Sequence, residues 1–254
     1  MTQFIAIIPA RYASTRFEGK PLVSIFGKPM IQHVYERVHK IFEYCIVATD
    51  DNRIEKAVKS FGGEVVMTST EHHSGTDRCY EALQKAGILF NKQFDVVVNV
   101  QGDEPFIHAE QLKAIKECFD EPEIQIATLI KPFKENEDIF NANSPKVVIS
   151  KKGFALYFSR SVIPYLRSYD PTRWQNNHTY YKHIGLYAYR SRVLAEITSL
   201  EQGELEQCES LEQLRWLENG YKIKTAITDY ESHAIDTPAD LEQVLKLYGN
   251  SFNK

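Results

Sequence analysis

The chain has 254 residues and a mass of 29.3 kDa, enough for one large domain with a substantial buried core. Hydrophobic residues make up 43% and charged residues 25%, which excludes a disordered or a fibrous chain. The formal net charge is −4, from 30 basic and 34 acidic residues, so no overall field attracts a polyanion. We therefore expect no nucleic-acid partner.

The cysteines and the apolar segments indicate the compartment. The four cysteines are far apart and form no C-x-x-C pair, so they predict reduced thiols rather than a zinc or redox motif. The amino-terminal apolar run lacks a basic flank and is too short for a signal peptide. No stretch approaches the roughly 20 apolar residues that span a bilayer, so we expect a cytoplasmic protein without a membrane partner.

The first hundred residues alternate between two hydrophobic periods. Short apolar runs predict strands, and amphipathic segments between them predict helices. This alternation predicts βαβ units in an α/β, Rossmann-like fold, with a mainly parallel sheet. The expected strands are 4–8, 44–48, 64–67 and 95–100, and the expected helices are 31–38, 52–61 and 74–85.

The second half departs from this alternation and contains several consecutive strands. We interpret residues of about 160–220 as a region inserted in one domain that covers 1–254. The segment 168–179 is polar and predicts a loop. The expected strands are 124–130, 146–149, 154–158, 181–189 and 222–227, and the expected helices are 210–218 and 238–248.

Two helix starts are marked by side chains that can cap free backbone N–H groups. Ser74 and Asp77 have the spacing of a capping box. Thr237 precedes Pro238, and proline suits the first turn of a helix because no N–H is needed there.

The loop after the first predicted strand is the first feature that indicates chemistry. Arg11, Arg16 and Lys20 lie there together with Ser14 and a glycine, at the carboxyl end of a strand where open α/β sheets bind ligands. Arginine offers a planar fork for phosphate oxygens and lysine a compact charge, so the loop could surround a polyphosphate. Its spacing matches neither the Walker A loop nor G-x-G-x-x-G, so a solvated basic turn is an equal alternative.

Several segments resemble cytidylyltransferases that activate acidic sugars, in particular those acting on 3-deoxy-manno-octulosonate (Kdo). The loop that begins at Arg11 is similar to the family's R-x-x-S-T-R-x-P-G-K signature. Further similar segments follow in the family's order over most of the chain. They are 73–78 (HSGTDR), 99–105 (NVQGDEP), 155–160 (ALYFSR), 182–187 (KHIGLY), 211–215 (LEQLR) and 236–238 (DTP).

One position departs from the signature. Glu18 stands where the family usually has proline. A carboxylate that pointed inward would weaken the field of the surrounding cations, so we expect Glu18 to face solvent or to pair with a neighbouring cation.

The resemblance implies a glycosyltransferase-A type fold with helices on both faces of the sheet. It also makes the inserted region of about 160–220 a sugar-binding and dimerisation region, so we expect a homodimer. The apolar residues of strand 180–189 and helix 210–218 point the same way, because they offer more apolar surface than one sheet edge should need.

The resemblance also implies a reaction of CTP with Kdo that gives CMP-Kdo and pyrophosphate, a step toward the lipopolysaccharide inner core. Arg11, Arg16 and Lys20 would stabilise the charge that develops on the phosphates. The nucleotide-binding set comprises Ala10, Arg11, Ser14, Arg16, Lys20, Ser74, Arg78 and Asp103.

Two carboxylates are candidate Mg²⁺ ligands. Asp103 and Asp236 each follow a predicted strand, and Mg²⁺ prefers one or two carboxylates together with water and phosphate oxygens. The resemblance assigns both of them to the metal and to catalysis. Asp236 has a second interpretation, because an acid before Thr-Pro also suits a helix start.

The sugar side draws mainly on the second half of the chain. Arg160 could form a bidentate pair with the sugar carboxylate. By resemblance, the residues that bond the sugar hydroxyls are Gln101, His183, Tyr187, Glu212 and Gln213. A lone histidine in an apolar strand, such as His183, is also typical of a protein core.

The resemblance leaves other functions open. The same reaction on 8-amino-Kdo would use nearly the same pocket, and sialic acid is a more distant alternative. A non-catalytic nucleotide-binding protein of this fold should have lost a metal carboxylate or a loop cation, whereas this chain keeps all five such residues.

Overall fold

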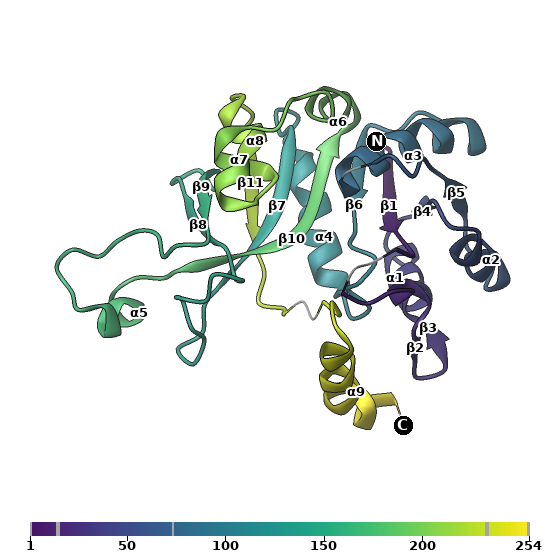
Figure 1. The fold of residues 1–254 in the computed structure, drawn as a ribbon. Helices are drawn as coiled ribbons and strands as arrows, with labels where there is room; N and C mark the ends of the chain where they lie inside the picture. Colours follow the sequence, from purple (N-terminus) through teal and green to yellow (C-terminus); the bar gives the residue numbers. More distant parts are fainter. Residues whose placement is uncertain (1, 14–15, 73, 232–233, 253–254) are drawn as a thin grey trace. The chain divides into compact units, whose positions relative to one another are not determined.

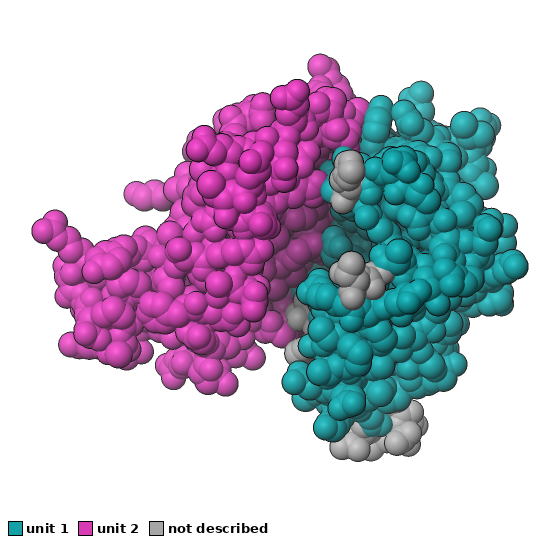
Figure 2. All heavy atoms as spheres, viewed as in Figure 1, with its two compact units in different colours: residues 1–112, 232–254 teal, residues 113–231 magenta. Residues whose placement is uncertain are grey.

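The computed structural model describes residues 2–13, 16–72, 74–231 and 234–252. The chain forms two compact units, 1–112 with 232–254 and 113–231, here called unit 1 and unit 2 (Figure 2). The region of 160–220 that we expected to be inserted lies within unit 2, which begins earlier and ends later. None of the described helices is long and apolar enough to cross a lipid bilayer.

Unit 1 is built on a parallel sheet of four strands in the order β6-β1-β4-β5 (Figure 1). The central strands β1 (Phe4–Ala10) and β4 (Cys45–Thr49) are almost wholly buried, which explains their continuous apolar sequences. The predicted parallel α/β arrangement is confirmed.

The chain order of unit 1 creates a switch point beside β1. From β1 the chain passes through α1 (Met30–His39) and α2 (Asn52–Ser60) toward β5, and then returns through α3 (Gly75–Leu89) to β6 on the other side of β1. Because such crossovers are right-handed, this reversal puts α3 on the face opposite α1 and α2. The carboxyl end of β1 is therefore the edge where a doubly wound sheet binds its ligand.

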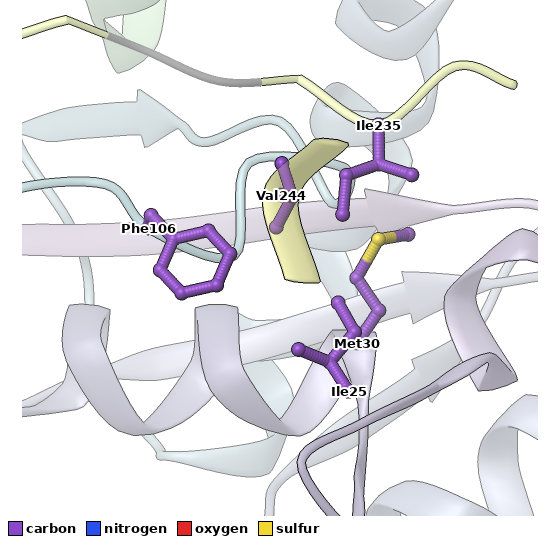
Figure 3. Close-up of a cluster of buried hydrophobic side chains, with 5 residues drawn as sticks. All are labelled: Ile25, Met30, Phe106, Ile235 and Val244. Carbon is purple, nitrogen blue, oxygen red and sulfur yellow. The ribbon is translucent and has the colours of Figure 1, made fainter. Parts of the chain in front are cut away.

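The carboxyl-terminal segment returns to unit 1 and completes its core. Figure 3 shows Ile235, from this segment, and Val244, from α9, against Ile25, Met30 and Phe106. All five side chains are at most 3% exposed, so the returning segment is anchored by apolar burial. The remaining elements of unit 1 are η1 (Lys20–Leu22), β2 (Ser24–Ile25), β3 (Lys28–Pro29), β5 (Val65–Met67), β6 (Val96–Asn99) and α9 (Pro238–Phe252).

Unit 2 contains a mixed sheet in which β7 (Ile126–Pro132) pairs in parallel with β11 (Ile223–Ile227) and antiparallel with β10 (Tyr181–Arg190). Two antiparallel strands extend it beyond β10. The other elements are β8 (Lys146–Ile149), β9 (Ala155–Ser159), η2 (Cys118–Asp120), η3 (Pro171–Arg173), α5 (Trp174–Asn177), α6 (Ser191–Ile197), α7 (Glu204–Glu209) and α8 (Gln213–Glu218), and α4 (Ala109–Glu117) contains the boundary with unit 1.

Two predictions for unit 2 were wrong in detail. The expected helix of 210–218 begins only at Gln213, because Ser210 adopts a left-handed conformation with φ 50° and ends α7. The expected loop of 168–179 contains η3 and α5, where Asp170 caps the first turn and Trp174 is buried.

Candidate active site

A cavity of about 420 Å³ lies at the carboxyl end of β1. The basic loop, the start of α3 and the loop after β6 line it together, so the structure gathers segments that are far apart in the sequence. Its lining includes Ala10, Arg11, Arg16, Lys20, Gly75, Gln101 and Asp103, which contains most of the residues predicted for the nucleotide.

The basic loop is closed on itself by Tyr12 and Gly19. The Gly19 N–H donates to the Tyr12 carbonyl at 2.9 Å. Gly19 has φ +69°, and a Cβ there would lie 3.1 Å from the Tyr12 ring, so both the backbone and the space require glycine. The Arg53 guanidinium covers the same ring at 3.2 Å from its centroid. Sequence reasoning missed Tyr12 and Arg53, since stacking between distant residues leaves no local pattern.

Lys20 joins the two candidate metal ligands. Its Nζ atom lies 2.6 Å from Asp103 Oδ2 and 3.0 Å from Asp236 Oδ1. Arg16 lies beside the same Asp236 oxygen at 3.2 Å. Three predicted catalytic side chains therefore meet at one point, and Arg16 stands at its rim.

Backbone contacts bring the two carboxylates to this point. A Cβ on Gly102 would lie 2.7 Å from the Pro9 carbonyl, so only glycine lets the loop after β6 pass so close to the end of β1. The Ile235 N–H then donates to the Asp103 carbonyl at 2.9 Å. Because the buried Ile235 holds this segment in place, Asp236 is fixed beside Asp103.

Asp236 also stands at a helix start, as its second interpretation predicted. The Asp240 carboxylate accepts hydrogen bonds from the backbone N–H groups of Asp236 and Thr237, and the Thr237 hydroxyl accepts from the Asp240 N–H. These bonds cap α9 and leave the Asp236 side chain with Lys20 and Arg16. The two interpretations of Asp236 are therefore compatible.

The charges at this point stabilise one another. Burial acts against the charged form of Lys20, but the adjacent carboxylates of Asp103 and Asp236 outweigh it and raise the pKa of the ammonium. A compact cation thus occupies the space between two carboxylate oxygens. No group of three or more His, Cys, Asp or Glu side chains within the described residues is arranged for a metal.

Arg11 lies deeper in the site than Arg16. Its guanidinium donates to the His72 carbonyl at 2.6 Å, and burial, together with the nearby Arg78, lowers the pKa of Arg11. Ser74 accepts from the Asp77 N–H in the predicted capping box, which is confirmed and places the start of α3 at the cavity. Ser14 lies outside the described residues.

Arg78 is placed differently from the other predicted nucleotide residues. Its side chain is fully buried and forms an ion pair with Asp50 at 2.6 Å and a hydrogen bond with Thr68. These contacts anchor α3 to the ends of neighbouring strands. The arrangement supports a structural role for Arg78, and its contact with a nucleotide stays a prediction.

Glu18 is exposed, as we expected of a carboxylate in a phosphate-binding loop. The ion pairs of Arg16 and Lys20 go to Asp103 and Asp236 instead. Glu18 therefore does not compete with a triphosphate for Arg16 and Lys20.

Four of the predicted sugar residues come together within unit 2. The rings of His183 and Tyr187 lie 5.2 Å apart, and Tyr187 meets Trp216 of α8 edge-on at 5.1 Å. Gln213 starts α8, and its buried Nε2 atom has no hydrogen-bond partner among the described residues. Burial raises the pKa of Tyr187, and the charge of Glu212, the residue before Gln213, raises it further. Burial also lowers the pKa of His183 to about 4, so the imidazole is neutral near pH 7.

Arg160 is held by the turn between α7 and α8. Its Nε atom donates to the Glu209 carbonyl at 2.6 Å and its NH2 group to the Ser210 carbonyl at 3.2 Å, while NH1 donates to Ala142 at 3.0 Å. The Glu209 carboxylate in turn accepts from the Arg160 N–H and the Ser159 hydroxyl. Three of the five guanidinium donors are thus used within the chain, which leaves two for a ligand. Sequence reasoning missed Glu209, because its contacts span about fifty residues.

Comparison with known proteins decides the family. The family model described as cytidylyltransferase matches residues 5–223. This chain belongs to the cytidylyltransferase family. It is 61% identical to the 3-deoxy-manno-octulosonate cytidylyltransferase of Parabacteroides distasonis, over 98% of this chain and 100% of the relative. The relative of that name from Bacteroides thetaiotaomicron is also 61% identical, over 98% and 99% of the two chains.

A solved structure of CMP:2-keto-3-deoxy-manno-octonic acid synthetase complexed with CTP agrees with the fold of this cytidylyltransferase. It has a TM-score of 0.89 and 41% identity, and the match covers 98% of this chain and 100% of the other. The predicted family, nucleotidyltransferase-type fold and enzyme class are confirmed.

Proposed function

We propose that this cytidylyltransferase transfers the cytidylyl group of CTP to Kdo and releases pyrophosphate. The oxygen of the sugar's anomeric hydroxyl bonds to the α-phosphorus, the bond between the α-phosphorus and the bridging oxygen breaks, and the hydroxyl proton passes to solvent. The observation that carries the proposal is the cavity at β1, where Lys20 and Arg16 meet Asp103 and Asp236. The relatives' names supply the substrates.

The cations of the basic loop bind and orient the triphosphate in this proposal. Negative charge grows on the α-phosphoryl oxygens and on the leaving pyrophosphate, so the main requirement is electrostatic. Arg11 and Lys20 are partly buried and already held by neighbours, which lowers the cost of ordering them around phosphate. Cytosine would be selected by backbone groups near Ala10 and at the start of α3.

We include Mg²⁺ in the proposal, with Asp103 and Asp236 as its ligands. The two carboxylates fit the ion, since one atom of each lies within 3.0 Å of a single cationic nitrogen and both are hard oxygen donors. When bound, Mg²⁺ would supply charge neutralisation for the phosphates. The chain's own residues then provide the binding and the orientation of the substrates.

Within unit 2 the sugar would be bound by Arg160, His183, Tyr187, Glu212 and Gln213. Gln101 lines the cavity at β1 in unit 1, and its contact with the sugar stays a prediction. The two free donors of Arg160 suit a carboxylate, and the neutral His183 suits a hydroxyl.

The homodimer remains part of the proposal, but its first rationale was wrong. We expected strand 180–189 and helix 210–218 to present apolar surface, whereas Tyr189, Leu214 and Trp216 are at most 1% exposed within the chain. Among the described residues of unit 2, the exposed aromatic ones are Phe140, Tyr165, Tyr169 and Tyr230. Light scattering at micromolar concentration should give twice 29.3 kDa, and a monomer alone would remove the dimer from the proposal.

The activity is tested by pyrophosphate release with each of the four nucleoside triphosphates against a panel of acid sugars. We expect release only with CTP, and fastest with Kdo. A preference for 8-amino-Kdo or sialic acid would change the substrate and keep the reaction. Absence of release with every pair, with CTP still bound, would indicate a non-catalytic nucleotide-binding protein. The cytoplasmic location stays a prediction.

A further inference from the structure

An irregularity in β10 brings two of the sugar residues together. Ile184 pairs with Leu129 of β7, but the next paired residue of β10 is Tyr187, which lies opposite Thr128. Residues 185–186 therefore form a bulge, with no residue of β7 opposite them in the register. In a regular strand the Cα atoms of His183 and Tyr187 would be about 13 Å apart, too far for their side chains to be neighbours. With the bulge between them, their ring centroids lie 5.2 Å apart.

The hydroxyl of Thr128 fills this bulge. Thr128 is fully buried, and its Oγ1 atom lies 2.9 Å from the Leu186 carbonyl, 3.2 Å from the Ile184 carbonyl and 3.0 Å from His183 Nε2. Carbonyls only accept hydrogen bonds, and the hydroxyl of Thr128 has a single proton. Donation to His183 would leave both carbonyl oxygens against Oγ1 with no proton between them, whereas donation to the closer Leu186 carbonyl leaves only one such contact. The proton therefore goes to a carbonyl. Oγ1 must then accept from His183, which puts the imidazole proton on Nε2.

The other nitrogen of His183 is left as an acceptor. Burial lowers the pKa of His183 to about 4, so near pH 7 the ring carries only one proton. The imidazole packs against two neighbouring rings. The centroids of Phe158 and Tyr187 each lie 5.2 Å from its own. Across the described part of the chain, Thr128 is the one hydrogen-bond partner of the His183 ring.

We propose that Thr128 is a positioning residue for the sugar: it holds His183 as the Nε2–H tautomer beside Tyr187, so that Nδ1 accepts a hydrogen bond from a sugar hydroxyl. The proposal rests on the proposed function, because it takes the sugar to be the ligand of His183. Thr128 itself touches no substrate and acts through the imidazole and the bulge.

Two substitutions at Thr128 and one matched control test the proposal. Thr128→Val keeps the shape and removes the hydroxyl, whereas Thr128→Ser keeps the hydroxyl. Thr225→Val is the control, because Thr225 lies opposite Thr128 on the neighbouring β11 and its hydroxyl bonds the Gly153 carbonyl instead. The readouts are the KM values for Kdo and CTP and the ¹⁵N spectrum of histidine-labelled protein, with His183 assigned by its absence in His183→Gln.

In the wild type we expect a protonated Nε2 and an unprotonated Nδ1 whose signal shifts when Kdo is added. Thr128→Val should lose the single tautomer and raise the KM for Kdo about tenfold, as expected for one lost hydrogen bond, with little change for CTP. Thr128→Ser should restore both properties. The only effect expected of Thr225→Val is a lower melting temperature. The tautomer of His183 and both KM values should stay as in the wild type.

Three outcomes would overturn the proposal. The first is an Nδ1–H tautomer in the wild type, which is measured even if Thr128→Val does not fold. The second is an equal rise of both KM values in Thr128→Val, which indicates a structural role alone. The third is a Thr128→Ser variant with the defects expected of Thr128→Val. If the wild type turned over no acid sugar, the proposed function would fail while the tautomer could still be measured.

Discussion

Lys20 Nζ lies 2.6 Å from Asp103 Oδ2 and so connects the loop after β1 with the loop after β6. The same ammonium contacts Asp236 at 3.0 Å. A positive charge already stands where we propose a divalent cation, so the two carboxylates are held close together before any metal arrives. Their mutual repulsion is offset by the chain itself.

Neutralising either carboxylate should abolish turnover without unfolding the protein. Asp103→Asn and Asp236→Asn keep the shape of the side chain, but they remove half of the anionic charge available to Mg²⁺. We expect at least about 100-fold slower pyrophosphate release at saturating CTP and Kdo. Rates measured over a Mg²⁺ titration check this, with Asp120→Asn, an exposed acid of unit 2, as the control. Near-wild-type turnover in either variant would remove that residue from the metal site.

Gly19→Ala should weaken CTP binding through the shape of the basic loop. The backbone at Gly19 has φ +69°, and the added Cβ would press on the Tyr12 ring. Gly27→Ala is a matched control, because Gly27 has φ +83° but open space around its Cβ position. Both variants should lose about 1 kcal/mol of stability, and only Gly19→Ala should also raise the KM for CTP. An equal effect on CTP binding in both variants would exclude the Tyr12 contact as its cause.

Arg160→Ala should raise the KM for Kdo far more than the KM for CTP. The expected loss is on the order of 2 kcal/mol for a charged hydrogen bond. The melting temperature should also fall, since the guanidinium bridges three backbone carbonyls. Arg192→Ala is the control, because the Arg192 side chain is 91% exposed. It should change neither the KM values nor the melting temperature. Equal effects on both substrates would place Arg160 on the triphosphate instead.

His183 should make the protein less stable in acid. Burial lowers the pKa of His183 from 6.5 to about 4, so between these values the unfolded chain binds a proton that the folded chain does not. The stability from the neutral imidazole is complete above pH 6.5 and is lost as the pH falls toward 4. Between pH 7.5 and 5.0 the loss should be about 2 kcal/mol. Urea unfolding at both pH values measures it, and a His183→Gln variant with the same pH dependence would exclude this histidine as the source.

The sequence predicted those parts of the molecule that depend on local patterns. The apolar run of β1 and the caps at Ser74 and Thr237 each report a local preference of the chain, and the structure confirms them. The helix expected from Ser210 failed because hydrophobic spacing contains no information about a single left-handed residue.

The site residues were predicted from their types and by resemblance. The residues that position them were not predicted. Tyr12, Glu209 and Thr128 each act on residues far from them in the chain, through a ring face, a carbonyl or a bulge. No spacing rule connects such partners, so only the folded chain shows them.

The return of the chain to unit 1 has a consequence for biosynthesis. Residues 1–112 already contain the basic loop and Asp103, but Ile235, Asp236 and Val244 are translated only after all of unit 2. On the ribosome, a nascent chain that stops short of them has one acid beside Lys20 and leaves Met30 and Phe106 without their apolar cover. Prematurely terminated chains therefore lack both the complete charge cluster and a closed core, and they should be recognised by proteases rather than accumulate as partly active enzyme.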